Sequence, residues 1–221
     1  HVLPPHVSAL ILPLRALVGQ LSTPDRIPQI EIAVGDASTV LVFRHLLPLS
    51  DADLKRLEEF AARWSIDVWL QPGGPDSARP LNKESSLYYE LPEFGVRIAF
   101  TPTDFTQVNH GVNRILVSRA VRLLDPRPGE RVADLFCGLG NFSLPLAKRG
   151  AQVIGFEGSK PLIERARQNA AANGLVAQFE VRDLFKQDVA AFGPFDKVLF
   201  DRPREGAVEL VKSLGGGWPR R

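Results

Sequence analysis

The sequence contains no methionine and only one cysteine, Cys137, among its 221 residues. One cysteine can form neither an internal disulfide nor a thiolate metal site, so a reducing, cytoplasmic compartment is the expected location. No apolar run approaches the roughly 20 residues that span a membrane, and there is no signal peptide, so no membrane partner is expected. Because the chain starts at His1 and lacks methionine, we expect a fragment of a longer protein.

The sequence also has little excess of one charge over the other. It has 27 Lys and Arg against 25 Asp and Glu, and its formal net charge is +2. This balance permits an RNA partner without requiring one, because the distribution of charge matters more than its sum. The four histidines are scattered along the chain, which favours solvated or capping roles over metal binding. No metal site is predicted.

Residues 1–100 are predicted to form a small α+β domain with mostly antiparallel strands. Apolar residues recur at helical spacing over residues 4–21, interrupted at Pro13, and Ser50 is placed to cap a helix over 51–64. Alternating or continuous apolar runs predict strands over residues 29–35, 38–46, 66–70, 86–91 and 96–100.

Residues 101–221 are predicted to form a Rossmann-like α/β domain. A helix over 108–124 places Val112, Ile115, Leu116, Ala120 and Leu123 on one apolar side. Strands over 131–136, 151–157, 177–181 and 195–201 then alternate with helices, as in a parallel, doubly wound sheet. Because such a sheet normally has five or more strands, we predict that this domain is truncated before its fifth strand.

Residues 134–141 read DLFCGLGN and join the first of these strands to a helix. In an open parallel sheet, ligands bind beyond the carboxyl ends of the strands, where the glycine turn 138–141 falls together with Glu157, Asp183 and Asp201. Glu157 closes the second strand, where a carboxylate can accept hydrogen bonds from both ribose hydroxyls of an adenosine. Asp183 follows the third strand, where an adenine edge is expected.

The glycine turn distinguishes between possible ligands. Ser143 stands where a dinucleotide fingerprint needs a third glycine. Asp134, the Asn141 side chain and the turn carbonyls instead offer acceptors for the ammonium of an amino-acid tail. S-adenosylmethionine therefore fits best, and a dinucleotide or a structural turn without a ligand are the alternatives.

Five motifs in this order resemble those of the RNA uracil-5-methyltransferases, and most of all those of the bacterial enzymes that form 5-methyluridine in 23S ribosomal RNA. They are DFTQVNHGVN (104–113), VADLFCGLGNFSLPLA (132–147), VIGFEG (153–158), QNAAANG (168–174) and FDKVLFDRPREGA (195–207). The resemblance is most specific over residues 104–207. It is looser over the first hundred residues, which are similar to the central RNA-facing domain of that family.

The resemblance implies a set of cofactor contacts, from Gln107, Phe136, Asn141, Glu157, Asp183 and Asp201. The amide of Gln107 would reach the methionine part, and Phe136 would lie beside the cofactor. Asp201 ends the fourth strand, nearest the reacting methyl. A core role for Phe136 and a helix-capping role for Gln107 are the alternatives. The following Arg202 departs from the family, which more often has a small residue or proline there.

The function that the resemblance implies is transfer of methyl from S-adenosylmethionine to carbon 5 of a uridine in RNA, in 23S ribosomal RNA, by a full-length parent enzyme. This chemistry needs a thiolate that adds to carbon 6 and a base that removes the carbon-5 proton. Cys137 lies in the cofactor turn and is interpreted as a packing residue. The nucleophilic cysteine and the glutamate base are therefore expected beyond the chain end, so no catalytic residue is assigned and the fragment is expected to be inactive.

Other readings stay open. The parent could be a methyltransferase of another substrate, or the chain a non-catalytic RNA-binding fragment. An iron–sulfur cluster is possible in the full-length protein but not in this chain, and the sequence does not specify the oligomeric state. Five arginines are candidates for phosphate contacts or for a solvated face: Arg114, Arg119, Arg122, Arg202 and Arg204.

Overall fold

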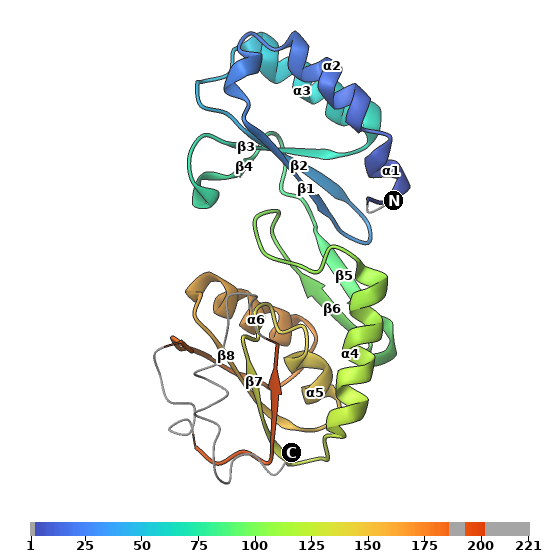
Figure 1. The fold of residues 1–221 in the computed structure, drawn as a ribbon, viewed down its shortest axis with the longest axis vertical. Helices are drawn as coiled ribbons and strands as arrows, with labels where there is room; N and C mark the ends of the chain where they lie inside the picture. Colours follow the sequence, from blue (N-terminus) through green and yellow to red (C-terminus); the bar gives the residue numbers. More distant parts are fainter. Residues whose placement is uncertain (1–2, 186–192, 202–221) are drawn as a thin grey trace. The chain divides into compact units, whose positions relative to one another are not determined.

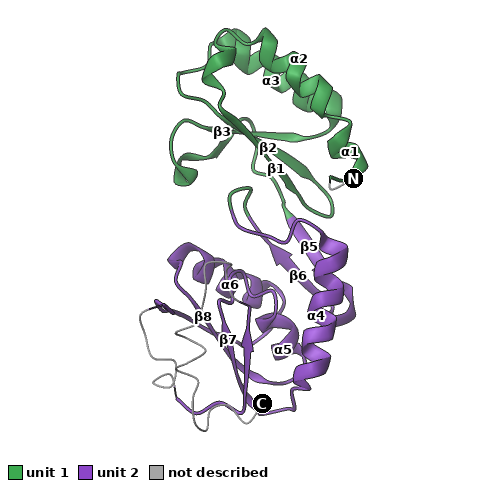
Figure 2. Cartoon of the chain, in the orientation of Figure 1, with its two compact units in different colours: residues 1–87, 101–103 green, residues 88–100, 104–221 purple. Residues whose placement is uncertain are grey.

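The computed structural model describes residues 3–185 and 193–201, and the chain forms two compact units. Unit 1 comprises residues 1–87 and 101–103, and unit 2 comprises residues 88–100 and 104–221 (Figure 2). The division predicted at residue 100 differs from this grouping in the β-hairpin of residues 88–100, which belongs to unit 2, and in residues 101–103, which belong to unit 1. No helix in the described ranges is long and apolar enough to cross a bilayer.

Unit 1 is a four-stranded sheet with two helices packed side by side along one face (Figure 1). Its elements are α1 (Pro5–Ser8), α2 (Ile11–Gln20), η1 (Pro24–Arg26), β1 (Gln29–Val34), β2 (Thr39–Arg44), α3 (Asp51–Trp64), β3 (Asp67–Gln71), η2 (Pro75–Ser77) and β4 (Arg79–Pro80). The core between helices and sheet includes Leu14, Leu41, Phe43 and Leu57.

The sheet of unit 1 has the order β1-β2-β3-β4. Its outer pairs are antiparallel, as predicted, but β2 and β3 run parallel. The physical reason is the connection between them, because α3 carries the chain back across the sheet before β3 begins. The small unit therefore contains one β–α–β crossover.

The predicted interruption of the first helix lies at a different residue. The helix breaks at Ala9 and Leu10, between α1 and α2, and not at Pro13. Pro13 is the third residue of α2, where a backbone N–H has no partner within the helix, so the missing proton of proline costs no intrahelical hydrogen bond.

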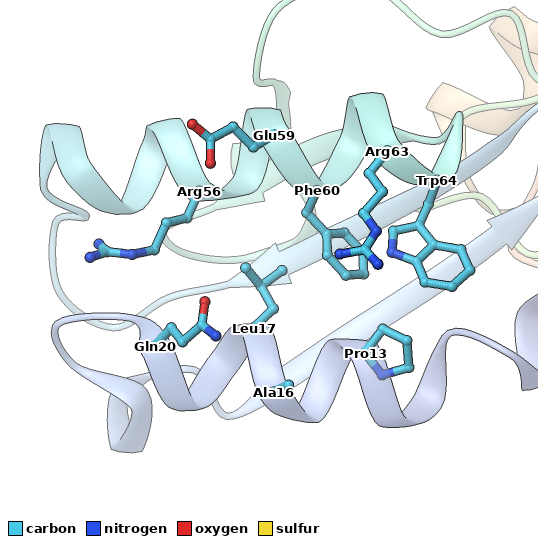
Figure 3. Close-up of a pocket in the computed structure, with 9 residues that line it drawn as sticks. All are labelled: Pro13, Ala16, Leu17, Gln20, Arg56, Glu59, Phe60, Arg63 and Trp64. Atoms are coloured by element: carbon cyan, nitrogen blue, oxygen red, sulfur yellow. The ribbon is translucent and has the colours of Figure 1, made fainter.

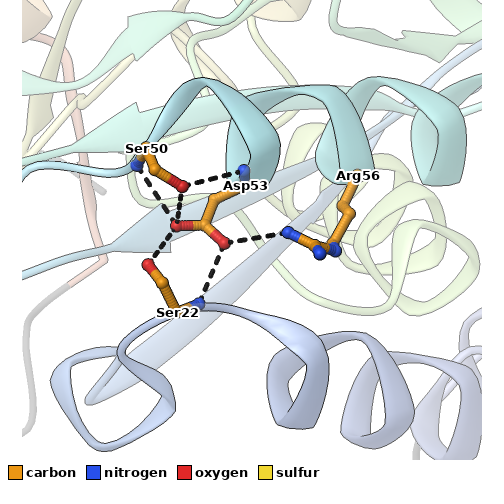
Figure 4. Close-up of polar contacts among 4 residues, drawn as sticks. All are labelled: Ser22, Ser50, Asp53 and Arg56. Carbon is orange, nitrogen blue, oxygen red and sulfur yellow. Dashed lines mark hydrogen bonds and ion pairs between the residues drawn. The ribbon is translucent and has the colours of Figure 1, made fainter.

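Ser50 caps α3 as predicted, and the cap belongs to a polar cluster around the buried Asp53 that joins α3 to Ser22, just after α2 (Figure 4). The Asp53 carboxylate accepts hydrogen bonds from the Ser50 backbone N–H (3.1 Å), from the Ser22 backbone N–H (2.9 Å) and from both serine hydroxyls. Arg56 lies 3.4 Å from the same carboxylate. Burial alone would raise the pKa of Asp53, but the hydrogen bonds from Ser22 and Ser50 outweigh it and lower that pKa from 3.8 to about 2.

We expect Asp53→Asn to lower the free energy of unfolding of unit 1 by about 2 kcal/mol at pH 7. Because the pKa is lower in the folded state, this stabilisation is complete above about pH 4 and is lost as the pH falls toward about 2. Denaturant unfolding of both proteins at a series of pH values measures the difference. The exposed Asp51, in the same helical turn, supplies the control Asp51→Asn. An equal loss in both variants, or a loss that does not change with pH, would contradict this account.

Unit 2 contains the hairpin and a parallel sheet with its helices. Its elements are β5 (Tyr88–Leu91), η3 (Pro92–Phe94), β6 (Val96–Ala99), α4 (His110–Leu124), β7 (Arg131–Leu135), α5 (Ser143–Lys148), β8 (Gln152–Glu157), α6 (Lys160–Ala172), β9 (Gln178–Val181) and β10 (Lys197–Phe200). All three pairings in the sheet β10-β7-β8-β9 are parallel, which confirms the predicted doubly wound pattern of strands 131–136, 151–157, 177–181 and 195–201.

The strand order places a topological switch at β7. The chain proceeds from β7 to β8 and β9 on one side and then returns to pair β10 on the other side of β7. In open α/β sheets the connections leave in opposite directions at such a point, and ligands bind in the crevice that this opens beyond the carboxyl ends. The glycine turn directly follows β7, so it lies at the switch.

The predicted apolar side of α4 was wrong. The helix buries Asn113, Val117 and Val121, and the exposed positions include Val112, Ile115, Leu116 and Leu123. The buried stripe starts at an asparagine, which a search for apolar periodicity does not select.

Candidate functional site

The strand register brings the predicted ligand residues to one edge of the sheet. Leu135, at the end of β7, is paired with Phe156 on one side and with Phe200 on the other. Glu157, the last residue of β8, and Asp201, the residue after β10, each follow one residue later, at the same level on either side of Phe136. The two carboxylates therefore share the carboxyl edge, next to the glycine turn.

The glycine turn is held open by two residues with left-handed backbone. Gly138 has φ +51° and Gly140 has φ +90°, conformations that L side chains rarely adopt. A Cβ added to Gly138 would meet nothing within 4 Å, whereas one added to Gly140 would lie 3.3 Å from Leu144. Space next to Gly138 is thus available for a ligand, while Gly140 allows the close packing of α5.

The Glu157 carboxylate points at this turn. One of its oxygens accepts a hydrogen bond from the backbone N–H of Gly138 (3.3 Å), and the other accepts one from that of Ser159 (3.0 Å). A carboxylate offers about four lone-pair sites, so two remain for further donors. The geometry fits the predicted pair of ribose hydroxyls.

Asp134 lies beneath the turn and is fully buried. One of its oxygens accepts a hydrogen bond from the Ser143 hydroxyl (2.5 Å), and the other has no partner among the described residues. Burial raises the pKa of Asp134 to about 7; the Ser143 hydrogen bond opposes this, and the charges of Asp201 and Glu157 add to it. A buried carboxylate oxygen without a donor is costly, and a cationic donor from a ligand would relieve that cost.

Phe136 has an uncommon backbone conformation, with φ +64°. A bulky residue in the left-handed region is a genuine outlier, and such strain gathers at ligand sites. Its partly buried ring packs against Phe185 (centroids 5.4 Å apart) and Phe200 (5.8 Å) at the strand ends. Both the predicted place beside a ligand and the alternative core role are compatible with these contacts.

Asn141 is committed to a network that the sequence did not predict. Its side-chain oxygen accepts hydrogen bonds from the Tyr89 hydroxyl (2.9 Å) and the Asn113 amide (3.0 Å), and its amide donates to Asn113 (2.9 Å). Burial raises the pKa of Tyr89, so the phenol stays protonated and acts as a donor. The oxygen of Asn141 thus has two donors already, which leaves its second amide hydrogen and its backbone for a ligand.

The remaining predicted residues are exposed. Asp183 follows β9, and its carboxylate accepts a hydrogen bond from the Phe185 backbone N–H (3.2 Å). Asp201 is exposed at the end of β10, and Gln107 is exposed in the segment before α4. Arg202 and Arg204, two of the predicted phosphate contacts, lie outside the described residues. A third, Arg114, donates from its guanidinium to the backbone oxygen of Glu90 (2.9 Å).

Cys137 is a packing residue in the structure. Its side chain is 3% exposed, and its Sγ would lie 2.8 Å from a Cβ added to Gly155 on the neighbouring strand. Burial, together with the charges of Asp134 and Glu157, raises the pKa of the thiol well above its usual value. A buried neutral thiol is not a nucleophile.

We therefore expect the Cys137 thiol of the folded protein to react with iodoacetamide at pH 8 at least about 100-fold more slowly than in the unfolded chain, because reaction needs local opening. Peptide mass spectrometry follows the modification, with the same protein in denaturant as control. A folded protein that reacts as fast as the unfolded one would contradict the packing role.

A groove in the described residues belongs to unit 1. It has a volume of about 460 Å³ and lies between α2 and α3, where Phe60, Arg63 and Trp64 point from α3 toward α2 (Figure 3). Its lining combines an apolar helix–helix seam with exposed charged ends, and the Arg63 guanidinium stands 5.9 Å from the Trp64 ring. It contains neither the glycine turn nor the strained and unpartnered groups, so we place the candidate site at the strand ends of unit 2.

Comparisons with known proteins show a similarity to methyltransferases. A family model described as a methyltransferase domain matches residues 126–215. A 23S rRNA (uracil(1939)-C(5))-methyltransferase RlmD of Thiobacillus denitrificans is 58% identical over 100% of this chain and 53% of its own length. The protein of the same name from Aromatoleum aromaticum is 56% identical over 96% of this chain and 51% of its own length. The chain thus spans about half the length of the curated relatives it matches.

Solved structures share the fold. A Pyrococcus abyssi tRNA (uracil-54, C5)-methyltransferase, in complex with S-adenosyl-L-homocysteine, matches with a TM-score of 0.62 at 24% identity, covering 83% of this chain and 45% of that one. An M. jannaschii tRNA m1G37 methyltransferase matches with a TM-score of 0.55 at 16% identity, covering 96% of this chain and 61% of that one. The predicted α/β, Rossmann-like methyltransferase fold is confirmed.

Proposed function

Because the chain is a close homologue, along its whole length, of proteins named 23S rRNA (uracil-C5)-methyltransferases, we propose that it is part of an enzyme that methylates carbon 5 of a uridine in RNA. The observation that carries the proposal is the edge formed by Glu157, the open turn at Gly138 and the unpartnered oxygen of Asp134. These groups fit an adenosyl ligand with an amino-acid tail. The resemblance that the five motifs indicated is confirmed by the relatives.

The cofactor in this proposal is S-adenosylmethionine, which supplies an electrophilic methyl on a sulfonium. Glu157 accepts the ribose hydroxyls, and Asp183 lies where the adenine edge is read. Asp134 accepts from the ammonium, and Asn141 contributes its backbone and remaining amide hydrogen. The predicted contacts of Gln107, Phe136 and Asp201 complete the set, with Asp201 nearest the methyl. In the Pyrococcus abyssi structure the ligand is S-adenosyl-L-homocysteine, the demethylated form of this cofactor.

The RNA partner is ribosomal RNA in this proposal. The rRNA-methyltransferase relatives are 58% and 56% identical to the chain, against 24% for the tRNA enzyme of known structure. We assign unit 1 to an RNA-facing domain and unit 2, which includes the hairpin 88–100, to the methyltransferase domain. We place the protein in the cytoplasm, where ribosomal RNA is modified.

The nucleophilic thiol must come from outside these 221 residues. Cys137 is the single cysteine of the chain, and it is buried and neutral. A thiolate has to add to carbon 6 before carbon 5 can attack the methyl, and a base must then remove the carbon-5 proton. We therefore expect the 221-residue chain alone to be inactive and the full-length protein to be active.

Tritium release tests the reaction. The full-length protein should release tritium from 23S ribosomal RNA labelled at carbon 5 of uridine, in the presence of S-adenosylmethionine, and the Cys137→Ser variant should retain the activity. Methyl transfer to RNA without tritium release would point to a methyltransferase of another substrate. If the protein neither released tritium nor bound the cofactor, the result would favour a non-catalytic RNA-binding role.

A further inference from the structure

Two asparagines, Asn169 on α6 and Asn173 at its C-cap, hold the open edge of the hairpin β5–β6. Asn169 accepts a hydrogen bond from the Ala99 backbone N–H (2.9 Å) and donates to its carbonyl oxygen (3.1 Å). Asn173, one helical turn later, does the same with Arg97, at 2.8 Å and 2.7 Å. Each side-chain amide thus replaces the backbone of a neighbouring strand.

The spacing of the two asparagines matches the spacing of the two strand residues that they bind. Residues four apart on a helix are separated by about 6 Å along its axis, and residues two apart on a strand by about 6.7 Å. Asn169 and Asn173 can therefore face Ala99 and Arg97 together. The hairpin forms a sheet of only two strands, which is marginal alone, so these amides explain why it belongs to unit 2.

The two asparagines differ in their third hydrogen bond. The amide of Asn169 also donates to the backbone oxygen of Leu139, inside the glycine turn (3.2 Å). The amide of Asn173 donates instead to the backbone oxygen of Asn169, within its own helix (2.7 Å). Asn169 is 2% exposed, so its bond to the turn is shielded from water.

The turn is anchored at three positions by residues of four elements of unit 2, β5, α4, β8 and α6. Glu157 on β8 holds the Gly138 N–H, Asn169 on α6 holds the Leu139 oxygen, and Tyr89 and Asn113 hold the side chain of Asn141. A turn with two glycines in the left-handed region has much conformational freedom to lose, so fixed anchors are needed to keep it in one conformation.

We propose that Asn169 is a positioning residue for the cofactor: through Leu139 it fixes the glycine turn in the conformation that receives the amino-acid tail. The inference rests on the proposed function, because it needs a ligand at this turn. Asn169 acts through the turn backbone and does not need to touch the ligand. Asn173 stabilises the hairpin without this effect.

Calorimetric titration of the full-length protein with S-adenosylhomocysteine tests the proposal, with Asn173→Ala as the matched control for Asn169→Ala. Each substitution removes three hydrogen bonds between a side-chain amide and the backbone. Both should lower the melting temperature. Asn169→Ala should weaken binding at least about tenfold, measured well below that temperature, and Asn173→Ala less than about twofold.

The labelling rate of Cys137 gives a second readout that does not depend on the ligand. Cys137 lies under the same turn, so Asn169→Ala should expose it to iodoacetamide faster than Asn173→Ala does. If Asn169→Ala does not fold, Asn169→Ser takes its place in both measurements. Equal affinities in the two variants, with binding by the unsubstituted protein intact, would overturn the positioning role alone. Absence of binding by the unsubstituted protein would overturn the cofactor assignment and this role with it.

Discussion

Glu157→Ala should weaken the binding of S-adenosylhomocysteine about 100-fold or more. The carboxylate closes β8 at the carboxyl edge, and the bonds it accepts from Gly138 and Ser159 leave two lone-pair sites for the ribose diol. A hydrogen bond to a charged group contributes about 1.5–3 kcal/mol, so losing two of them removes about 3 kcal/mol or more. Calorimetric titration of the full-length protein measures the loss.

Two variants separate the ribose contact from a general effect on the sheet. Glu180→Ala, on the adjacent β9, removes a carboxylate that is paired with Arg182 (2.8 Å), and it should leave the affinity unchanged. Glu157→Gln keeps an acceptor oxygen but loses the charge, so it should fall between Glu157→Ala and the unsubstituted protein. If Glu157→Ala bound S-adenosylhomocysteine as tightly as the unsubstituted protein, Glu157 would not bind the ribose.

Gly155→Ala should destabilise unit 2 by about 2–3 kcal/mol, because the new methyl group has no room. Its Cβ would lie 2.8 Å from Cys137 Sγ and 2.8 Å from a ring carbon of Phe179, closer than real Cβ contacts come. Cys137 and Phe179 are both buried, at 3% exposed each, so neither can move aside into solvent. Denaturant unfolding monitored by circular dichroism gives the change in free energy.

A matched substitution and a double variant make this prediction specific. At Gly158 a new Cβ would meet only the Arg182 backbone oxygen, at 3.7 Å, so Gly158→Ala should be nearly neutral. Cys137→Ala should recover part of the loss in the Gly155→Ala background, because it removes one of the two colliding atoms. Additive effects of Cys137→Ala and Gly155→Ala would mean that the two residues do not collide.

Elements with a strong local signal were predictable from the sequence. The four parallel strands of unit 2 are apolar runs bounded by turns, and each is found within one or two residues of its predicted limits. The capping role of Ser50 follows from a residue type that satisfies the free N–H groups at a helix start. These features depend on neighbouring residues in the chain.

Features that depend on distant residues were not predictable. The prediction of the buried side of α4 was wrong because Asn113 faces inward, where it hydrogen-bonds to Asn141, 28 positions away. QNAAANG was recognised as a motif, but the role of its asparagines depends on Ala99 and Arg97, 70 and 76 positions away. Two asparagines four residues apart on one helix face were the available signal. Tyr89 gave none, because an alternating strand does not show which side chain reaches a distant turn.

The structure of the full-length protein bound to S-adenosylhomocysteine tests the central claim most directly. The account predicts both ribose hydroxyls within about 3 Å of the Glu157 carboxylate, and the amino-acid tail against the turn at Gly138 and near Asp134. A ligand bound away from the carboxyl ends of β7 and β8, with Glu157 still bonded only to the amides of Gly138 and Ser159, would contradict it.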